Sequence, residues 1–197
     1  NGALWMGDGD DFLYNDGEWN PGQTPSYFGA GDDGIVNTGV INMDSSVIDL
    51  GTYSVYGNFF YNYGTVNVNG AFNHIDMRGP MAAIPSRNPL PFYNYGVIDF
   101  QDGAANDYLL ITGDFAGDGD INVDVSGLTE VSDVLYIVGS VVTGTVNTIN
   151  VDLLDLPDEI EALIPIVYVS GISVAGNFVL GDVDWDDINT FVTLDFD

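Results

Sequence analysis

One seven-residue pattern recurs four times in the first half of the chain and limits the folds open to it. Its shared form is an aromatic residue or Val, then Asn-x-Gly-x, a large apolar residue, and Asn or Asp. The copies occupy residues 14–20, 36–42, 61–67 and 93–99, and they begin 22, 25 and 32 residues apart. Asn-x-Gly indicates a tight turn, in which a left-handed φ costs little. A period of about 22 residues is too long for a hairpin and is typical of one coil of a β-solenoid.

A second repeat takes over in the latter half. Short runs of β-branched or aromatic residues end in Gly at 107–113, 133–139 and, more weakly, 165–171, and further strand patterns follow at 119–125 and 145–151. Alternating apolar residues in these runs direct one face inward. We therefore predict an all-β fold, a parallel β-helix (β-solenoid) with rungs of about 22–26 residues. An antiparallel β-sandwich also uses short strands with Gly and Asn turns, and it stays the alternative.

The whole chain, residues 1–197, is expected to form a single β-helix domain. Residues 74–92 interrupt the repeat and contain four prolines, so this stretch is expected to loop out of the solenoid. Residues 155–197 are expected to form a cap region. Within it, Leu156–Ile164 is the one helix candidate, since Pro157 suits a first helical turn.

Several segments resemble the C-terminal passenger region of large autotransporter outer-membrane proteins. They are Phe92–Phe100, Ala104–Phe115, Gly119–Val125, Ser132–Gly139 and Ile164–Asp182. The resemblance implies a right-handed β-helix that is exported across two membranes and displayed on the surface of a Gram-negative bacterium. The family has no shared catalytic residues, so none is carried over. The membrane barrel that follows such passengers is not in this sequence, so we expect either a fragment or a passenger that stands alone.

The charge balance excludes several classes of partner. Asp and Glu total 30 against 2 Lys and Arg, a formal net charge of −28. Nucleic acid is excluded because phosphate binding needs several basic side chains, and anionic membrane surfaces repel the chain for the same reason. Without a run of 18 apolar residues, we expect no membrane insertion by this chain. Such a charge favours a salty or calcium-rich exterior, where cations screen it.

A calcium site is the one cofactor candidate. Met6–Tyr14 and Phe28–Val36 resemble the calcium-binding nonapeptide of RTX β-rolls, lacking its first Gly. If these turns stack, their acidic side chains approach one another and repel unless a cation lies between them. The candidate ligands are Asp8, Asp10, Asp11, Asp32 and Asp33. The alternative is that Asp and Gly make good turns here, with the carboxylates in water.

Two further features suggest binding. Arg78 and Arg87 lie in the proline-rich interruption and are the only side chains with a permanent positive charge, so they are candidates for docking onto an acidic partner or a second copy. Pairing with nearby Asp residues of the same chain is the alternative. Clustered aromatic residues such as Tyr61, Tyr93 and Tyr95 could stack on sugars, although stacking along the solenoid itself is the ordinary explanation.

Enzymatic chemistry finds little support. Lys is absent from the sequence. His74, the only His, lies in the predicted loop, so a hydroxyl nucleophile would have no histidine to act as its base. We therefore expect no catalysis and predict an extracellular or cell-surface structural β-helix, such as an adhesin stalk, a biofilm component or a display passenger. Its partners would be the cell surface, extracellular matrix or other copies of itself as a homo-oligomer. A self-assembling filament or surface-layer protein is one alternative, and a glycan-active enzyme using Asp184, Asp186 and Asp187 is the other.

Overall fold

The computed structural model describes residues 1–52, 57–78, 90–155, 163–174 and 176–184. Within these ranges every helix or strand element is a strand, which confirms the all-β class. The helix predicted for Leu156–Ile164 falls mainly on residues 156–162, outside the described residues.

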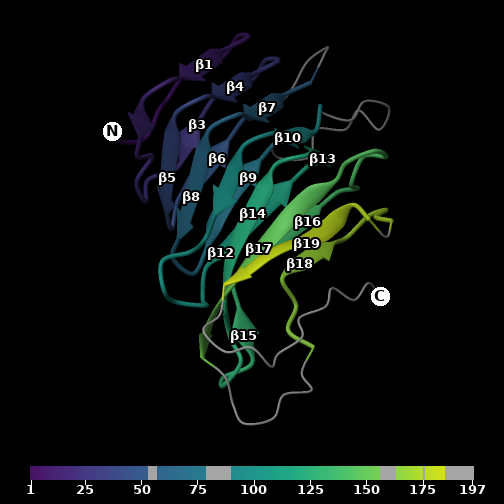
Figure 1. Cartoon of the computed structure of the whole chain (residues 1–197). Helices are drawn as coiled ribbons and strands as arrows, with labels where there is room; N and C mark the ends of the chain where they lie inside the picture. Colours follow the sequence, from purple (N-terminus) through teal and green to yellow (C-terminus); the bar gives the residue numbers. More distant parts are fainter. Residues whose placement is uncertain (53–56, 79–89, 156–162, 175, 185–197) are drawn as a thin grey trace.

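The strands form three sheets, and within each sheet the strands of successive coils follow one another along one axis, from the N-terminal to the C-terminal part of the chain (Figure 1). The first sheet contains, in spatial order, β1 (Phe12–Asn15), β4 (Gly34–Asn37), β7 (Phe59–Asn62), β10 (Phe92–Asn94) and β13 (Phe115–Gly117). The second contains β2 (Glu18–Trp19), β5 (Val40–Asp44), β8 (Thr65–Asn69), β11 (Val97–Asp99), β14 (Asp120–Ser126), β17 (Asn147–Asp155) and β19 (Phe178–Asp184). The third contains β3 (Ser26–Tyr27), β6 (Val47–Asp49), β9 (Asn73–Asp76), β12 (Tyr108–Thr112), β16 (Val134–Val138) and β18 (Val167–Val169).

All pairs along these three paths are parallel, and β15 (Val131–Ser132), beside β14, makes the one antiparallel pair in the described ranges. An antiparallel β-sandwich does not fit this pairing. Each of the first five coils contributes one strand to each sheet in turn, as expected of a β-solenoid. The later strands β17, β18 and β19 continue the second and third sheets alone within the described residues.

The recurring corners lie directly over one another. Tyr14 pairs with Val36, Val36 with Tyr61, and Tyr61 with Tyr93, so the four sequence copies coincide in register. The second repeat behaves in the same way, because Tyr108 of β12 pairs with Val134 of β16. The changing sequence spacing is therefore absorbed between strands, and the stacked positions stay aligned.

The glycine of the Asn-x-Gly corner has a different role from the one that the turn pattern indicates. Gly17, Gly39, Gly64 and Gly96 all have ordinary, not left-handed, φ angles. A Cβ on Gly39, Gly64 or Gly96 would instead lie 2.1 Å from the carbonyl oxygen of the glycine one coil earlier. The residue is needed because the coils approach closely there, so the explanation by left-handed φ is wrong at these corners.

Apolar side chains fill the interior in aligned columns. Inside the first sheet, Ile35 is followed by Phe60, Phe92 and Phe115 at the same register, and all four are fully buried. The rings of Phe60 and Phe92 stack with centroids 4.6 Å apart, and those of Phe92 and Phe115 with centroids 5.7 Å apart. Each coil thus covers the apolar side chains of the next, which is the main source of stability in stacked repeats.

A column of buried asparagines runs beside this apolar core. Asn15 donates to Asn37 at 2.7 Å, Asn37 to Asn62 at 2.8 Å, Asn62 to Asn94 at 2.9 Å, and Asn94 to Asn147 at 3.1 Å. We call this column the asparagine ladder. The first four members also donate to a backbone carbonyl beyond the corner, for example Asn62 to Val97 at 3.0 Å. The ladder therefore satisfies corner groups that would otherwise be buried without partners.

Both ends of the stretch predicted to loop out, residues 74–92, belong to the solenoid itself. His74 lies on β9 and not in a loop, Met77 is fully buried, and Phe92 begins β10. The His74 imidazole Nε2 lies 2.8 Å from the Thr112 hydroxyl oxygen on the neighbouring strand β12. Residues 79–89, which carry most of the prolines, lie outside the described residues.

Candidate functional site

The structure brings the predicted metal ligands together in pairs, one coil apart. The Asp11 backbone N–H donates to Asp33 Oδ1 at 2.8 Å, and the Asp32 backbone N–H donates to Asp10 Oδ1 at 3.0 Å. The two turns that carry these aspartates approach each other closely, because a Cβ on Gly29 would lie 1.7 Å from the Gly7 carbonyl oxygen. The stacking of the two nonapeptide-like turns, from which the calcium hypothesis started, is therefore present.

These pairs do not gather into a larger cluster. Within the described ranges, no three His, Cys, Asp or Glu side chains lie close enough together to hold a metal ion. The contacts of Asp10 and Asp33 are with backbone N–H groups, which is the usual role of Asp in turns. Calcium binding at Asp8, Asp10, Asp11, Asp32 and Asp33 stays a prediction.

Asp33 is the most unusual of these carboxyl groups. It is fully buried, and its Oδ2 has no hydrogen-bond partner. Burial, together with the nearby charges of Asp11, Asp10 and Asp32, raises the pKa of Asp33 from 3.8 to about 6, against a lowering by the Asp11 N–H. One coil further on, the equivalent residue is Asn58, whose Nδ2 donates to the carbonyls of Leu50 and Gly51, each at 2.9 Å. Asp33 therefore occupies a position suited to a donor, which its ionised form lacks.

We expect Asp33→Asn to stabilise the protein at pH 7.5 by about 3 kcal/mol, because each pKa unit between folded and unfolded states corresponds to about 1.4 kcal/mol and the pKa of Asp33 rises from 3.8 to about 6. The amide supplies the donor and removes a buried charge. The advantage should shrink as the pH falls from about 6 towards 4, where the native carboxyl is itself protonated. Chemical denaturation at several pH values measures the effect. The control is Asp16→Asn, the same charge change at an exposed turn residue; an equal gain there would refute the explanation.

A second group of buried carboxyls lies near the C-terminal half of the stack and was missed at the sequence level. Asp133 accepts the backbone N–H of Asp107 at 2.9 Å and that of Asp124 at 2.8 Å. Burial, partly offset by these hydrogen bonds and increased by the neighbouring charges, raises the pKa of Asp133 to about 7. Burial likewise raises the pKa of Asp107 to about 6. Asp107 and Asp133 open the repeated runs at 107–113 and 133–139, so the repeat could have indicated that they stack, whereas no sequence repeat places Asp124 beside them.

The raised pKa values predict an unusual dependence of stability on pH. Below the unfolded-state pKa of 3.8, the carboxyl groups of Asp33, Asp107 and Asp133 are protonated in both the folded and the unfolded state. As the pH rises towards 7, these groups release their protons in the unfolded chain before they do so in the native protein. The free energy of unfolding should therefore fall between about pH 4 and pH 7. Denaturation midpoints at constant high salt, which screens the general repulsion, measure this trend. A midpoint that instead rises over this range contradicts the assignment.

The basic residues show a contact within the chain. The Arg78 guanidinium lies 3.8 Å from the Asp114 carboxylate, and the Arg78 backbone N–H donates to Asp76 at 2.9 Å. A partly exposed ion pair at this distance contributes little to stability. Arg87 lies outside the described residues. Docking of a partner through Arg78 and Arg87 stays a prediction, as does chemistry by Asp184, Asp186 and Asp187, of which only Asp184 is described.

The outer face of the first sheet carries a second stacked array, made of tyrosines. The rings of Tyr61 and Tyr93 stack with centroids 4.7 Å apart, and those of Tyr63 and Tyr95 with centroids 5.3 Å apart. Along one coil, Tyr93 and Tyr95 lie 5.8 Å apart with nearly parallel planes. Burial raises the pKa of Tyr61 and Tyr95, and the neighbouring tyrosines add to the rise. We call these four residues the tyrosine array.

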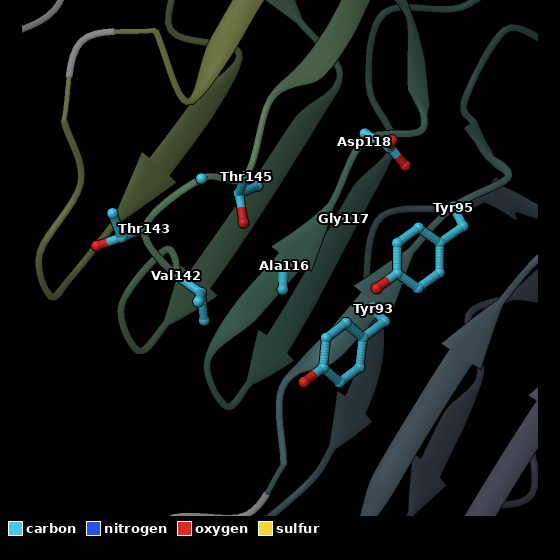
Figure 2. Close-up of a pocket in the computed structure, with 9 residues that line it drawn as sticks. Tyr93, Tyr95, Ala116, Gly117, Asp118, Val142, Thr143 and Thr145 are labelled. Carbon is cyan, nitrogen blue, oxygen red and sulfur yellow. The ribbon is translucent and has the colours of Figure 1, made fainter.

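A groove of about 240 Å³ borders the tyrosine array at β13. Figure 2 shows Tyr93 and Tyr95 on one side of it and Val142, Thr143 and Thr145 on the other, with Ala116 between them. Gly117, Asp118 and Gly144 complete the lining. Ring faces, hydroxyl groups and one carboxylate thus surround a small open site, a composition suited to binding a small ligand.

Comparison with known proteins adds no assignment. The chain matches no protein-family model, no curated protein and no solved structure. Among the described residues, no helix has the length and apolar character needed to cross a membrane.

Proposed function

We propose that this chain is a right-handed parallel β-helix displayed outside the cell, where it acts as a rigid, non-catalytic stalk or passenger. The observation that carries the proposal is the continuous registration of coils from β1 to β19. Successive coils are tied together by backbone pairing and by aligned apolar side chains, and the asparagine ladder adds side-chain hydrogen bonds from Asn15 to Asn147. Such a stack resists bending and extends a terminal group away from its base.

The surface charge supports an extracellular location. A net charge of −28 keeps copies of a rod apart in solution and needs salt or divalent cations for screening. The resemblance of the latter half of the chain to autotransporter passengers points the same way, towards the outer surface of a Gram-negative bacterium. Calcium at the stacked acidic turns would stiffen the N-terminal coils, which suits a calcium-containing exterior.

Antibodies raised against the purified chain provide the test of display. We expect them to label intact cells that produce the full-length native protein, and external protease to remove the label without breaking the cells. Labelling that appears only after permeabilisation would overturn surface display. Incubation of the purified chain with neutral and acidic polysaccharides should release no shortened products, and reproducible turnover would overturn the non-catalytic assignment.

A self-assembling filament is the second candidate, favoured by exposed aromatic residues at the first coil. Trp5 is 74% exposed, Phe12 55% and Tyr14 56%. Each of them contacts or pairs with the next coils on one side only, Trp5 with Tyr27, Phe12 with Phe59 and Tyr14 with Val36. A second copy that stacks onto this end would bury them. Sedimentation at increasing protein concentration, with and without calcium, distinguishes the candidates: a constant monomer supports the stalk, and concentration-dependent growth supports the filament.

A further inference from the structure

The tyrosine array ends abruptly at β13. In the first sheet, Tyr61 pairs with Tyr93, and Tyr93 pairs with Ala116. A large ring is thus followed, at the same outward position, by a single methyl group. The face of Tyr93 that turns away from Tyr61 is therefore not covered by another ring of the array, and the groove described above lies against it.

The far wall of the groove stands one coil beyond Ala116. The Val142 backbone N–H donates to the Phe115 carbonyl at 2.9 Å, and the turn closes where the Thr145 N–H donates to the Val142 carbonyl at 3.1 Å. Neighbouring coils are separated by about 4.8 Å, so Tyr93 and this turn are about 9.6 Å apart. Since stacked rings need about 4.5 Å or more between centroids, the interval is wide enough for one six-membered ring. Ala116 at its floor is only 4% exposed, so the ring would lie at the mouth of the interval, against Tyr93 and the turn.

The walls combine apolar and polar groups in a definite arrangement. Tyr93 and Tyr95 offer a flat surface two rings wide, while Asp118, Thr143 and Thr145 supply a carboxylate and two hydroxyls around it (Figure 2). A purely aromatic ligand would leave these polar groups without partners, whereas a pyranose has C–H groups on its faces and hydroxyls around its edge. An acidic sugar would be repelled by the net charge of −28.

We propose that this groove binds one ring of a neutral hexopyranose glycan, with a sugar face on Tyr93 and sugar hydroxyls donating to Asp118. The adjoining face of Tyr95 receives part of the next sugar, so short oligomers bind better than single sugars. The inference stands apart from the proposed function, because a rigid stalk needs no ligand and a sugar site needs no surface display.

Titration of the isotope-labelled chain with cellotetraose, maltotetraose and a β-1,4-galactan oligomer tests the proposal, with polygalacturonate as the anionic probe. At least one neutral oligomer should shift the backbone NMR signals of residues 116–118 and 142–145, and polygalacturonate should not. Tyr93→Ala should weaken binding at least tenfold, since a stacking surface is lost. Tyr14→Ala, an exposed tyrosine at the first coil of the same sheet, is the matched control and should leave binding unchanged.

A second variant keeps the test independent of folding defects. Ala116→Tyr continues the tyrosine array into the groove, so it should abolish sugar binding, while the circular dichroism spectrum and the backbone NMR signals away from the groove stay those of the folded protein. The proposal is overturned if no neutral oligomer shifts the groove signals, or if binding survives Ala116→Tyr. It is also overturned if the groove responds only to spermidine in a salt-sensitive manner, which would indicate a cation site, or only to protein concentration, which would indicate self-association.

Discussion

Replacing Gly64 with alanine is expected to lower the free energy of unfolding by at least about 3 kcal/mol, whereas Gly17→Ala should change it by less than about 1 kcal/mol. The two residues occupy the same place in the repeated heptad. A Cβ on Gly64 would lie 2.1 Å from the carbonyl oxygen of Gly39, whereas a Cβ on Gly17 would meet nothing within 4 Å. The difference arises because Gly64 has a preceding coil beneath it in the described structure.

Urea denaturation followed by far-ultraviolet circular dichroism measures both variants. Backbone carbonyls cannot rotate away as a flexible side chain would, so the coils around Gly64 must separate and lose the bonds from Thr65 to Gly39 and from Gly64 to Asn37, now 2.9 and 3.0 Å long. Equal and small effects at both glycines would show that coil spacing is not what requires glycine. Equal and large effects would show that a local property of the turn decides.

Asn62→Ala is expected to destabilise the protein by about 3 kcal/mol, since a buried polar group left without its partner costs about 1–3 kcal/mol. Asn62 is fully buried, accepts from Asn37 and donates to both Asn94 and the Val97 carbonyl. Its removal leaves all three of these groups short of a partner. Asn67→Ala is the matched control: Asn67 lies on the next strand, donates to Asn42 at 2.7 Å, and is half-exposed, so water replaces the lost bond.

The control variant should lose less than about 1 kcal/mol. Asn62→Asp separates the donor from the acceptor role, because a carboxylate still accepts from Asn37 but cannot donate. It should be destabilising at pH 8 and recover part of the loss when the pH is lowered enough to protonate it. If Asn62→Ala and Asn67→Ala cost the same, the buried ladder has no special contribution.

The alignment of coils was accessible from sequence because it depends on a local motif. The Asn-x-Gly corners and the paired runs at 107–113 and 133–139 recur with residue types that fix a turn and an inward face, so their superposition could be predicted. The reason for the glycine could not. Whether Gly64 needs a left-handed φ or room for a neighbouring carbonyl depends on the distance between coils, which the order of residues does not state.

The candidate site was less accessible for the same reason. Ala116 follows Tyr93 in space because β13 pairs with β10. The sequence marks this only by a degenerate copy of the heptad at 116–122, which keeps Gly119, Ile121 and Asn122 but has Ala and Gly in place of the aromatic residue and Asn. The raised pKa of Asp133 also depends on contacts between distant segments. Sequence did indicate that Asp11 and Asp33 lie together, because both belong to turns that repeat with one period.

The asparagine ladder gives the rod a polarity. From Asn15 to Asn147, each side-chain amide donates to the member that follows it along the stack. The amide dipoles therefore point the same way, with an acceptor facing the N-terminal end and a donor facing the C-terminal end. A coil added before Asn15 prolongs this chain only if it runs in the same direction, since it must then present an amide donor to the Asn15 oxygen. At the other side the ladder stops at Asn147, which donates back to the Gly117 carbonyl at 3.2 Å, while Asn177 of the last coil donates to the Thr145 carbonyl. The ladder therefore favours head-to-tail addition at the N-terminal end of the stack.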